Sequence, residues 1–106
     1  MHFKKKRFSS EFTSLSILEY LYLNSYNIPV SKYNIINNTP LIKKQRPDRV
    51  NLIISLLESN GYIKKFTISS TSTFYQITEK GKEAYSSWIK HYLEYARYIS
   101  DLDENQ

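Results

Sequence analysis

Apolar residues recur along this chain with two different spacings. Three stretches, at 11–25, 47–59 and 79–102, repeat them every three or four positions, which is the spacing of helices that bury one face. Two shorter stretches, 62–68 and 74–77, are rich in β-branched and aromatic residues, as strands are. The pattern predicts a mainly α fold with one β-hairpin, in the order helix, short helix, helix, strand, strand, long helix.

The first predicted helix runs from about Glu11 to Ser25, with Ser9 or Ser10 as its N-cap. Its apolar face is broad, as expected of a helix at the centre of a small bundle. The face comprises Phe12, Leu15, Ile17, Leu18, Leu21 and Tyr22.

The second predicted helix is short, from its N-cap Ser31 to about Asn37. We expect two of its side chains to face inward, Tyr33 and either Ile35 or Ile36. The sequence Asn37-Asn38-Thr39-Pro40 is a turn signal, although Thr39-Pro40 is equally suited to begin an extra helical turn. The connection to the third helix is therefore open at this point.

The third predicted helix begins at Pro47, because a proline in the first turn loses no hydrogen bond and has a φ angle already near helical. Its core-facing stripe is Val50, Ile53, Ile54 and Leu57. Asn60-Gly61 supplies a left-handed stop. The hairpin that follows has a polar, hydroxyl-rich tip at 69–73, without Gly or Pro.

The last predicted helix has Thr78 as N-cap and Glu79 in its first turn. Its apolar positions form a heptad-like seam about 27 Å long, which exceeds what so small a core can cover. We therefore expect a homodimer through a second copy of this helix; the alternative is a helix folded back over its own domain. The predicted interface is Tyr85, Trp88, Ile89, Tyr92, Tyr95, Ile99 and Leu102.

Charge and composition narrow the class of protein. Residues 1–50 carry nine Lys/Arg against three acids, whereas residues 51–106 carry six against seven. A basic first half indicates an anionic partner met by one face, with a basic solubilising surface as the alternative. The chain has no cysteine, no signal-peptide pattern and no apolar run of bilayer length. We expect a cytoplasmic, nucleoid-associated protein with no membrane partner.

Enzymatic chemistry is not indicated. The histidines are His2 and His91, and the glycines Gly61 and Gly81 form no phosphate-binding loop. No nucleophile–base spacing or metal-ligand cluster is present in the sequence. We expect no catalysis, no metal and no cofactor.

Three segments together resemble the winged helix-turn-helix DNA-binding proteins of the PadR and MarR type, and small basic archaeal winged-helix dimers. They are "Ile-Leu-Glu-Tyr-Leu" at 17–21, "Leu-Leu-Glu-Ser-Asn-Gly-Tyr-Ile" at 56–63 and "Tyr-Gln-Ile-Thr-Glu-Lys-Gly-Lys-Glu" at 75–83. The resemblance implies an α-α-α-β-β-α winged helix at 11–80. A flexible basic arm at 1–10 precedes it, and a C-terminal dimerisation helix with an acidic tail at 81–106 follows.

The resemblance also implies which residues meet double-stranded DNA, because the third helix of such folds enters the major groove and the wing touches the backbone. The base-reading positions are Arg49, Asn51 and Ser55. The phosphate-contacting positions are Lys43, Lys44, Arg46, Lys64, Lys65, Ser70 and Thr71, with Lys4, Lys5, Lys6 and Arg7 of the arm. Leu52 stands where many relatives carry a polar or basic residue, so the base-reading face is small.

The function that follows is a homodimeric transcriptional regulator. Two alternatives keep the same fold: a DNA-organising or plasmid/chromosome segregation factor, and an adaptor that binds protein partners through the third helix and the seam. The resemblance also allows an effector pocket between the last helix and the core, lined by tyrosines and Trp88. No residue pattern identifies a ligand.

Overall fold

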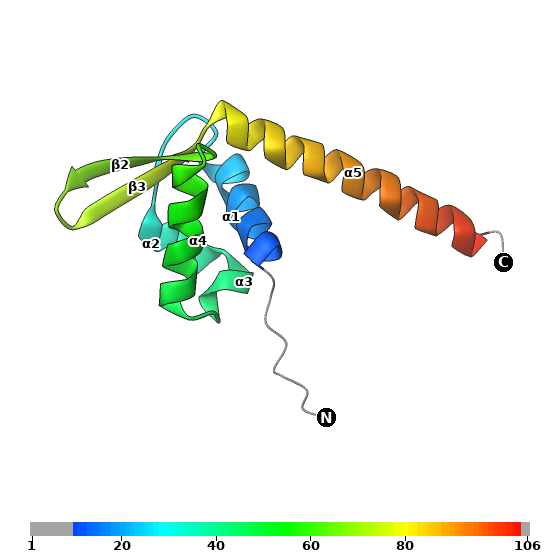
Figure 1. Ribbon diagram of the computed structural model, residues 1–106, viewed down its shortest axis with the longest axis horizontal. Helices are drawn as coiled ribbons and strands as arrows, with labels where there is room; N and C mark the ends of the chain where they lie inside the picture. The colour runs from blue at the N-terminus through cyan, green and yellow to red at the C-terminus, as the bar shows by residue number, and fades with distance from the viewer. Residues whose placement is uncertain (1–9, 105–106) are drawn as a thin grey trace, which may run out of the picture.

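The computed structural model describes residues 10–104, and the side chains of these apart from 40–41 and 99–104. Its elements are α1 (Ser10–Asn24), β1 (Val30–Ser31), α2 (Lys32–Asn38), α3 (Pro40–Lys43), α4 (Pro47–Ser59), β2 (Ile63–Ser69), β3 (Ser72–Ile77) and α5 (Glu79–Glu104). The helices α1 to α4 form a bundle, the β2–β3 hairpin projects from one side of it, and α5 leaves from its top (Figure 1). The predicted class, a mainly α chain with a β-hairpin wing and a long last helix, is confirmed.

The core lies where α1 and α4 meet the base of the sheet. Its buried apolar side chains come from every part of the domain before α5: Ile17, Leu18, Leu21, Ile35, Ile42, Val50, Ile53, Ile54, Leu57, Ile63, Tyr75 and Ile77. The whole stripe predicted for 47–59 is buried, since α4 packs its Val50–Leu57 face on α1. The hairpin is thus stabilised by packing its basal residues on the helices.

Both ends of α4 form by local chemistry. Arg46 is extended before Pro47, with φ −64° and ψ 134°, so the helix begins at the proline as predicted. At the other end Gly61 has φ 82°. The Tyr62 N–H donates to the Leu57 carbonyl at 2.9 Å and the Gly61 N–H to the Glu58 carbonyl at 3.0 Å. This is a Schellman motif, and it turns the chain directly into β2.

The sheet has three strands rather than the predicted two, in the order β1-β3-β2. The added strand is only Val30–Ser31, which pairs antiparallel with Tyr75 and Phe74 of β3. Two residues are too few to show an alternating pattern, so a sequence reading misses them. Ser31 also caps α2 as predicted, because its hydroxyl accepts from the Asn34 N–H at 3.0 Å.

The connection between α2 and α4 contains the extra helical turn left open above, α3. Two side chains that we predicted to face inward do not do so. Tyr33 is exposed, whereas Ile35 is buried and Ile36 packs against the core while partly buried. Phe12 is also exposed, because the first turn of α1 buries its neighbour Thr13 instead, and Thr13 is hydrogen-bonded to Gln45.

The last helix starts at a junction tied to the wing. The Thr78 hydroxyl accepts from the Gly81 N–H at 3.1 Å, which confirms it as N-cap, and donates to the Gly61 carbonyl at 2.6 Å. The Thr78 N–H donates to the Tyr62 carbonyl at 3.1 Å. With 26 residues, α5 is about 39 Å long. It runs away from the domain, so the alternative of a helix folded back over its own core is wrong (Figure 1).

Candidate nucleic-acid interface

The solvent face of α4 lies opposite its buried stripe. Asn51 and Ser55 are exposed on this face, as predicted. Two leucines share it, Leu52 at 59% exposure and Leu56 at 50%. Since residues four apart lie one turn above another, Leu52 and Leu56 form a short apolar strip beside the polar pair. The face therefore offers an amide, a hydroxyl and two isobutyl groups.

Arg49, the third predicted base-reading residue, is partly buried and held in place. Its Nε donates to the Gln45 Oε1 at 3.2 Å, and the Gln45 Nε2 donates to the Thr13 Oγ1 at 3.0 Å. Thr13 is fully buried in α1. A chain of hydrogen bonds thus runs from the core helix to the guanidinium group. Gln45 and Thr13 were not predicted, because the residues are 32 positions apart and no local pattern connects them.

The basic segment before α4 lies at the surface. Lys43 and Lys44 are exposed at the end of α3. Arg46 is also exposed, but its Nη2 lies 3.2 Å from the Asp48 carboxylate. An ion pair this exposed stabilises little, so Asp48 lowers the local positive charge without holding Arg46 firmly.

The wing carries its two lysines on opposite faces. Lys64 pairs in register with Gln76 and Lys65 with Tyr75, and successive strand residues point to opposite sides. The Lys64 ammonium lies 5.2 Å from the centroid of the Phe66 ring. At the tip Ser70 and Thr71 are exposed, and the Thr71 N–H donates to the Ser69 hydroxyl at 3.4 Å. The predicted phosphate contacts of the wing are all accessible.

The first turns of α5 are anchored to α1. The Tyr85 hydroxyl donates to the Glu19 carboxylate at 3.1 Å, and its ring lies 5.0 Å from that of Tyr22. Burial first, then the hydrogen bond and negative charge of Glu19, raise the pKa of Tyr85 to about 12. Tyr85, predicted for the dimer interface, thus contacts its own domain and fixes the direction in which α5 leaves.

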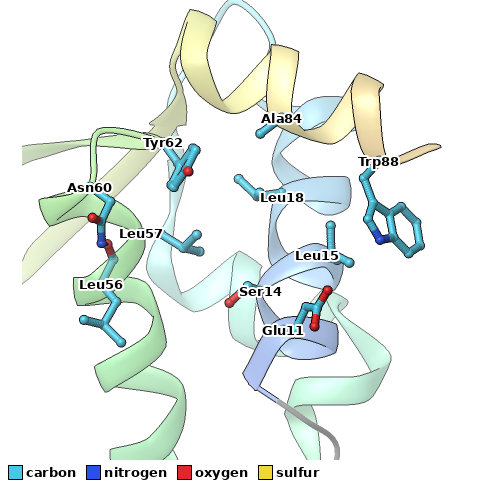
Figure 2. Close-up of a pocket in the computed structure, with 10 residues that line it drawn as sticks. All are labelled: Glu11, Ser14, Leu15, Leu18, Leu56, Leu57, Asn60, Tyr62, Ala84 and Trp88. Carbon is cyan, nitrogen blue, oxygen red and sulfur yellow. The ribbon is translucent and has the colours of Figure 1, made fainter. Parts of the chain in front are cut away.

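A groove of about 390 Å³ opens between α1, the end of α4 and α5 (Figure 2). Its walls are mostly apolar, with Leu15 and Leu18 on α1 facing Leu57 and Tyr62, and Trp88 at the α5 end. Polar groups stand at its rim: Glu11, Ser14 and Asn60. The groove lies where a pocket beside Trp88 was predicted.

Beyond the groove α5 exposes a long apolar surface. Trp88 stacks on Tyr92, with ring centroids 5.6 Å apart and planes at 14°. Trp88 and Ile89 are partly buried, whereas the later aromatic and aliphatic side chains are exposed: Tyr92, Leu93, Tyr95 and Tyr98. Leu93 and Tyr98 lie off the predicted seam. The Ile99 and Leu102 side chains, and the arm with Lys4, Lys5, Lys6 and Arg7, lie outside the described residues.

Two kinds of feature are absent from the part of the chain that the structure describes. Within it, no three His, Asp or Glu side chains lie together in a way that suits a metal ion. None of its helices combines the length and the hydropathy needed to cross a bilayer.

The sequence matches no protein-family model and no curated protein. Solved structures do match its fold. The protein smu.1704 from Streptococcus mutans UA159 has a TM-score of 0.70 at 19% identity, over 95% of this chain and 94% of that one. A PadR-like transcription factor from Bacteroides fragilis has a TM-score of 0.73 at 13% identity, over 88% and 91%. A transcriptional regulator from Clostridium thermocellum has a TM-score of 0.63 at 23% identity, over 90% and 97%.

These similarities extend over nearly the whole of each chain, including the long last helix. The sequence identities are low, so the similarities establish the fold alone. The predicted resemblance to the PadR type is confirmed at that level. The chain therefore has a winged helix-turn-helix fold with an extended C-terminal helix, the architecture of the PadR-like transcription factor from Bacteroides fragilis.

Proposed function

We propose that this protein is a homodimeric double-stranded DNA-binding transcriptional regulator and not an enzyme. The observation that carries the proposal is the solvent face of α4, which presents Asn51 and Ser55 directly after the exposed lysines of α3. A helix presented in this way on a winged fold is suited to the major groove, with the wing on the backbone. Two of the solved structures with this fold are described as transcription factors or regulators.

The chemistry of the α4 face favours A·T pairs. An asparagine amide pairs in bidentate fashion with adenine, and an aliphatic side chain contacts the thymine methyl group. Asn51 and Leu52 supply these two groups side by side. Arg49 is the group suited to guanine, and its hydrogen bond to Gln45 directs it toward the N-terminal end of α4. We infer a site that is mostly A·T with one guanine read by Arg49.

Most of the affinity is expected from phosphates. Lys43, Lys44 and Arg46 precede α4, where the N-terminal end of a helix also attracts anions. Lys64 or Lys65, with Ser70 and Thr71, would add contacts from the wing. The same contacts would serve a DNA-organising or segregation factor, which differs in lacking a preferred site.

The dimer is proposed from α5. About three-quarters of this helix, residues 86–104, extends beyond its anchor at Tyr85, with Tyr92, Leu93, Tyr95 and Tyr98 exposed. Exposed apolar surface of this extent is unfavourable in a soluble monomer. A second α5, related by a two-fold axis, is the partner of matching length and chemistry. It would cover this surface and the Trp88 end of the groove.

A duplex titration at two salt concentrations tests DNA binding. The variant Lys43→Ala/Lys44→Ala removes two charges from the proposed interface, and Lys90→Ala/Arg97→Ala removes two exposed charges from α5 as a matched control. Because each phosphate contact contributes about 0.9 to the slope of log affinity against log salt, the first variant should lower that slope by about 2. The control should leave the slope unchanged. Equal slopes for both variants would refute the α4 interface.

Site preference decides between a regulator and a DNA-organising factor. Selection of bound sequences from random duplexes should yield a two-fold symmetric, A·T-rich site for the wild type. Arg49→Ala should relax the sequence at one position per half-site and lose about tenfold in affinity there. Uniform recovery of all sequences would favour the DNA-organising alternative. If the wild-type protein binds no duplex at all, the adaptor alternative remains, with Leu52 and Leu56 as the strip that contacts a protein partner.

The single tryptophan reports the dimer directly. We expect a dimer by sedimentation at micromolar concentration, and a red shift of Trp88 emission on dilution as the indole becomes exposed. A chain ended after Ser86, which keeps the Tyr85 anchor, should be monomeric. A monomeric full-length chain at these concentrations would refute the α5 interface.

A further inference from the structure

The distal end of the wing contains an irregularity in strand pairing. Thr67 pairs with Thr73, but Ser69 pairs with Ser72, so the register shifts by one residue between them. Ile68 is the extra residue on β2 and has no partner on β3. This is a β-bulge, a feature that redirects a side chain out of the regular alternation of a strand.

The redirected side chain is an isoleucine at 73% exposure. Exposure alone does not single it out, because Ile28, in the loop before β1, is 70% exposed. What distinguishes Ile68 is its place. It sits at the bulge, near the end of a hairpin that stands clear of the helical bundle (Figure 1). No neighbouring element of the described chain comes near enough there to cover it.

The surroundings of Ile68 suit nucleic acid. From 62 to 78 the chain has Lys64 and Lys65 and no Asp or Glu. Five hydroxyl-bearing residues in succession, 69–73, form the tip. Lysines neutralise phosphates, hydroxyls hydrogen-bond to phosphate and to groove edges, and a single apolar side chain among them matches the composition of proteins that wedge into the minor groove.

The part of the β2–β3 hairpin that leads to the bulge, which we call the shaft, is stiffened by aromatic side chains. Phe66 and Phe74 are directly opposite each other on β2 and β3, and the Lys64 ammonium lies over the Phe66 ring at 5.2 Å. Cross-strand aromatic pairs stabilise a hairpin. A side chain that unstacks a base step must be held rigidly, because a flexible hairpin would move away from the stacked bases instead of separating them.

We propose that Ile68 is an apolar wedge that enters the minor groove beside the α4 site and partly unstacks one base step. The proposal rests on the duplex binding proposed above. An inserted side chain of this kind kinks the duplex toward the major groove. Flexible steps such as TA open most easily, so the wedge would select a TA or CA step at a position where no hydrogen bond reads the base. The wing would thus contribute to specificity through DNA deformability.

The test measures bending on a duplex of about 30 base pairs with a central TA step in A·T-rich sequence, labelled with a fluorophore at each end. Wild-type protein should shorten the end-to-end distance and raise energy transfer. Ile68→Thr keeps the β-branch but replaces the ethyl group with a hydroxyl, and should abolish most of the bend. We expect its affinity to fall about tenfold with the salt slope unchanged, since no phosphate contact is removed. Ile68→Leu should retain the bend.

Ile28→Thr is the matched control, because it makes the same change at an isoleucine of nearly equal exposure away from the wing. It should bend DNA as the wild type does. A bend that survives Ile68→Thr, or is lost equally in Ile28→Thr, overturns the wedge. So does a change in the mass of the protein in solution caused by Ile68→Thr, which would assign Ile68 to a contact between copies. Wild-type binding without a bend refutes the wedge alone, whereas absence of any duplex binding refutes the proposed function.

Discussion

Gly81→Ala tests how tightly the last helix is joined to the wing. Gly81 lies in the first turn of α5, where its N–H donates to the Thr78 hydroxyl at 3.1 Å. A Cβ at this position would lie 2.2 Å from the Tyr62 carbonyl oxygen and 2.8 Å from the Ile77 Cγ1. Non-bonded carbon contacts are normally about 3.5–4.0 Å. The helix start and the beginning of β2 would therefore have to separate by about 1 Å.

The cost follows from what that separation disrupts. Overpacking in a buried site costs about 1–3 kcal/mol. The movement also weakens the Thr78 cap and the bond from the Thr78 N–H to the Tyr62 carbonyl, for about 1 kcal/mol more. The higher helix propensity of alanine offsets about 1 kcal/mol of this cost. The net loss is about 1–3 kcal/mol of unfolding free energy, or about 5–20 °C in Tm for a domain of this size. We expect the upper end of this range, because the blocking atom is a backbone oxygen.

Gly61→Ala is the comparison, because these are the two glycines of the chain. Gly61 has φ 82° but open space around it, and a Cβ there would meet only the Lys80 Cδ at 3.8 Å. Its cost is the left-handed backbone strain of about 1–2 kcal/mol. We therefore expect Gly81→Ala to be the more destabilising substitution, although Gly81 is helical and Gly61 is not.

Urea and thermal unfolding of both variants, followed by far-UV circular dichroism, provide the measurement. Gly61→Asn should recover part of the loss at position 61, since asparagine tolerates the left-handed region. A Gly81→Ala protein as stable as the wild type, or more stable than Gly61→Ala, would contradict the packing of α5 against Tyr62 described above.

Three further substitutions test other contacts. Ser25→Ala leaves the buried Ile77 N–H without the Ser25 hydroxyl that accepts from it at 3.3 Å, and should cost about 1–3 kcal/mol in urea unfolding. An unchanged midpoint would show that this link, from the residue after α1 to β3, is not formed. Tyr85→Phe should lower Tm by a constant amount below pH 10. The gap should narrow between pH 10 and about 12, because the pKa of Tyr85 is raised in the folded protein and its contribution to stability is lost as the hydroxyl ionises. A gap that stays constant to pH 12 would refute the Glu19 contact. Gln45→Ala should relax base preference at the position proposed for Arg49, because Gln45 is the hydrogen-bond partner that positions its guanidinium group. The salt slope should stay unchanged, since the substitution removes no charge; an altered slope with intact preference would contradict that role.

Much of the architecture was predictable because its signals are local. Pro47 and Asn60-Gly61 bound α4 through backbone geometry that neighbouring residues enforce. Ser31 and Thr78 cap helices through hydrogen bonds to residues three positions on. The periodic stripe of Val50, Ile53, Ile54 and Leu57 indicated the buried face of α4, and hence the exposed Asn51 and Ser55 opposite to it. Each of these predictions required only residues within about two helical turns of one another.

Only the tertiary structure decided the rest. The two-residue strand β1 exists because β3 is there to pair with it, and no local pattern marks it. Arg49 looked like a simple exposed side chain; its hydrogen-bond partner Gln45 is only four positions away, but the fold alone places Thr13 of α1 against Gln45. In the sequence, Ile68 looks like an ordinary strand residue. Its bulge arises from the register between β2 and β3. By itself the sequence determined which faces are apolar and where helices begin and end, because those depend on residues a few positions apart. Pairing, register and the direction of α5 depend on contacts between distant segments, and a sequence pattern of short period carries no information about them.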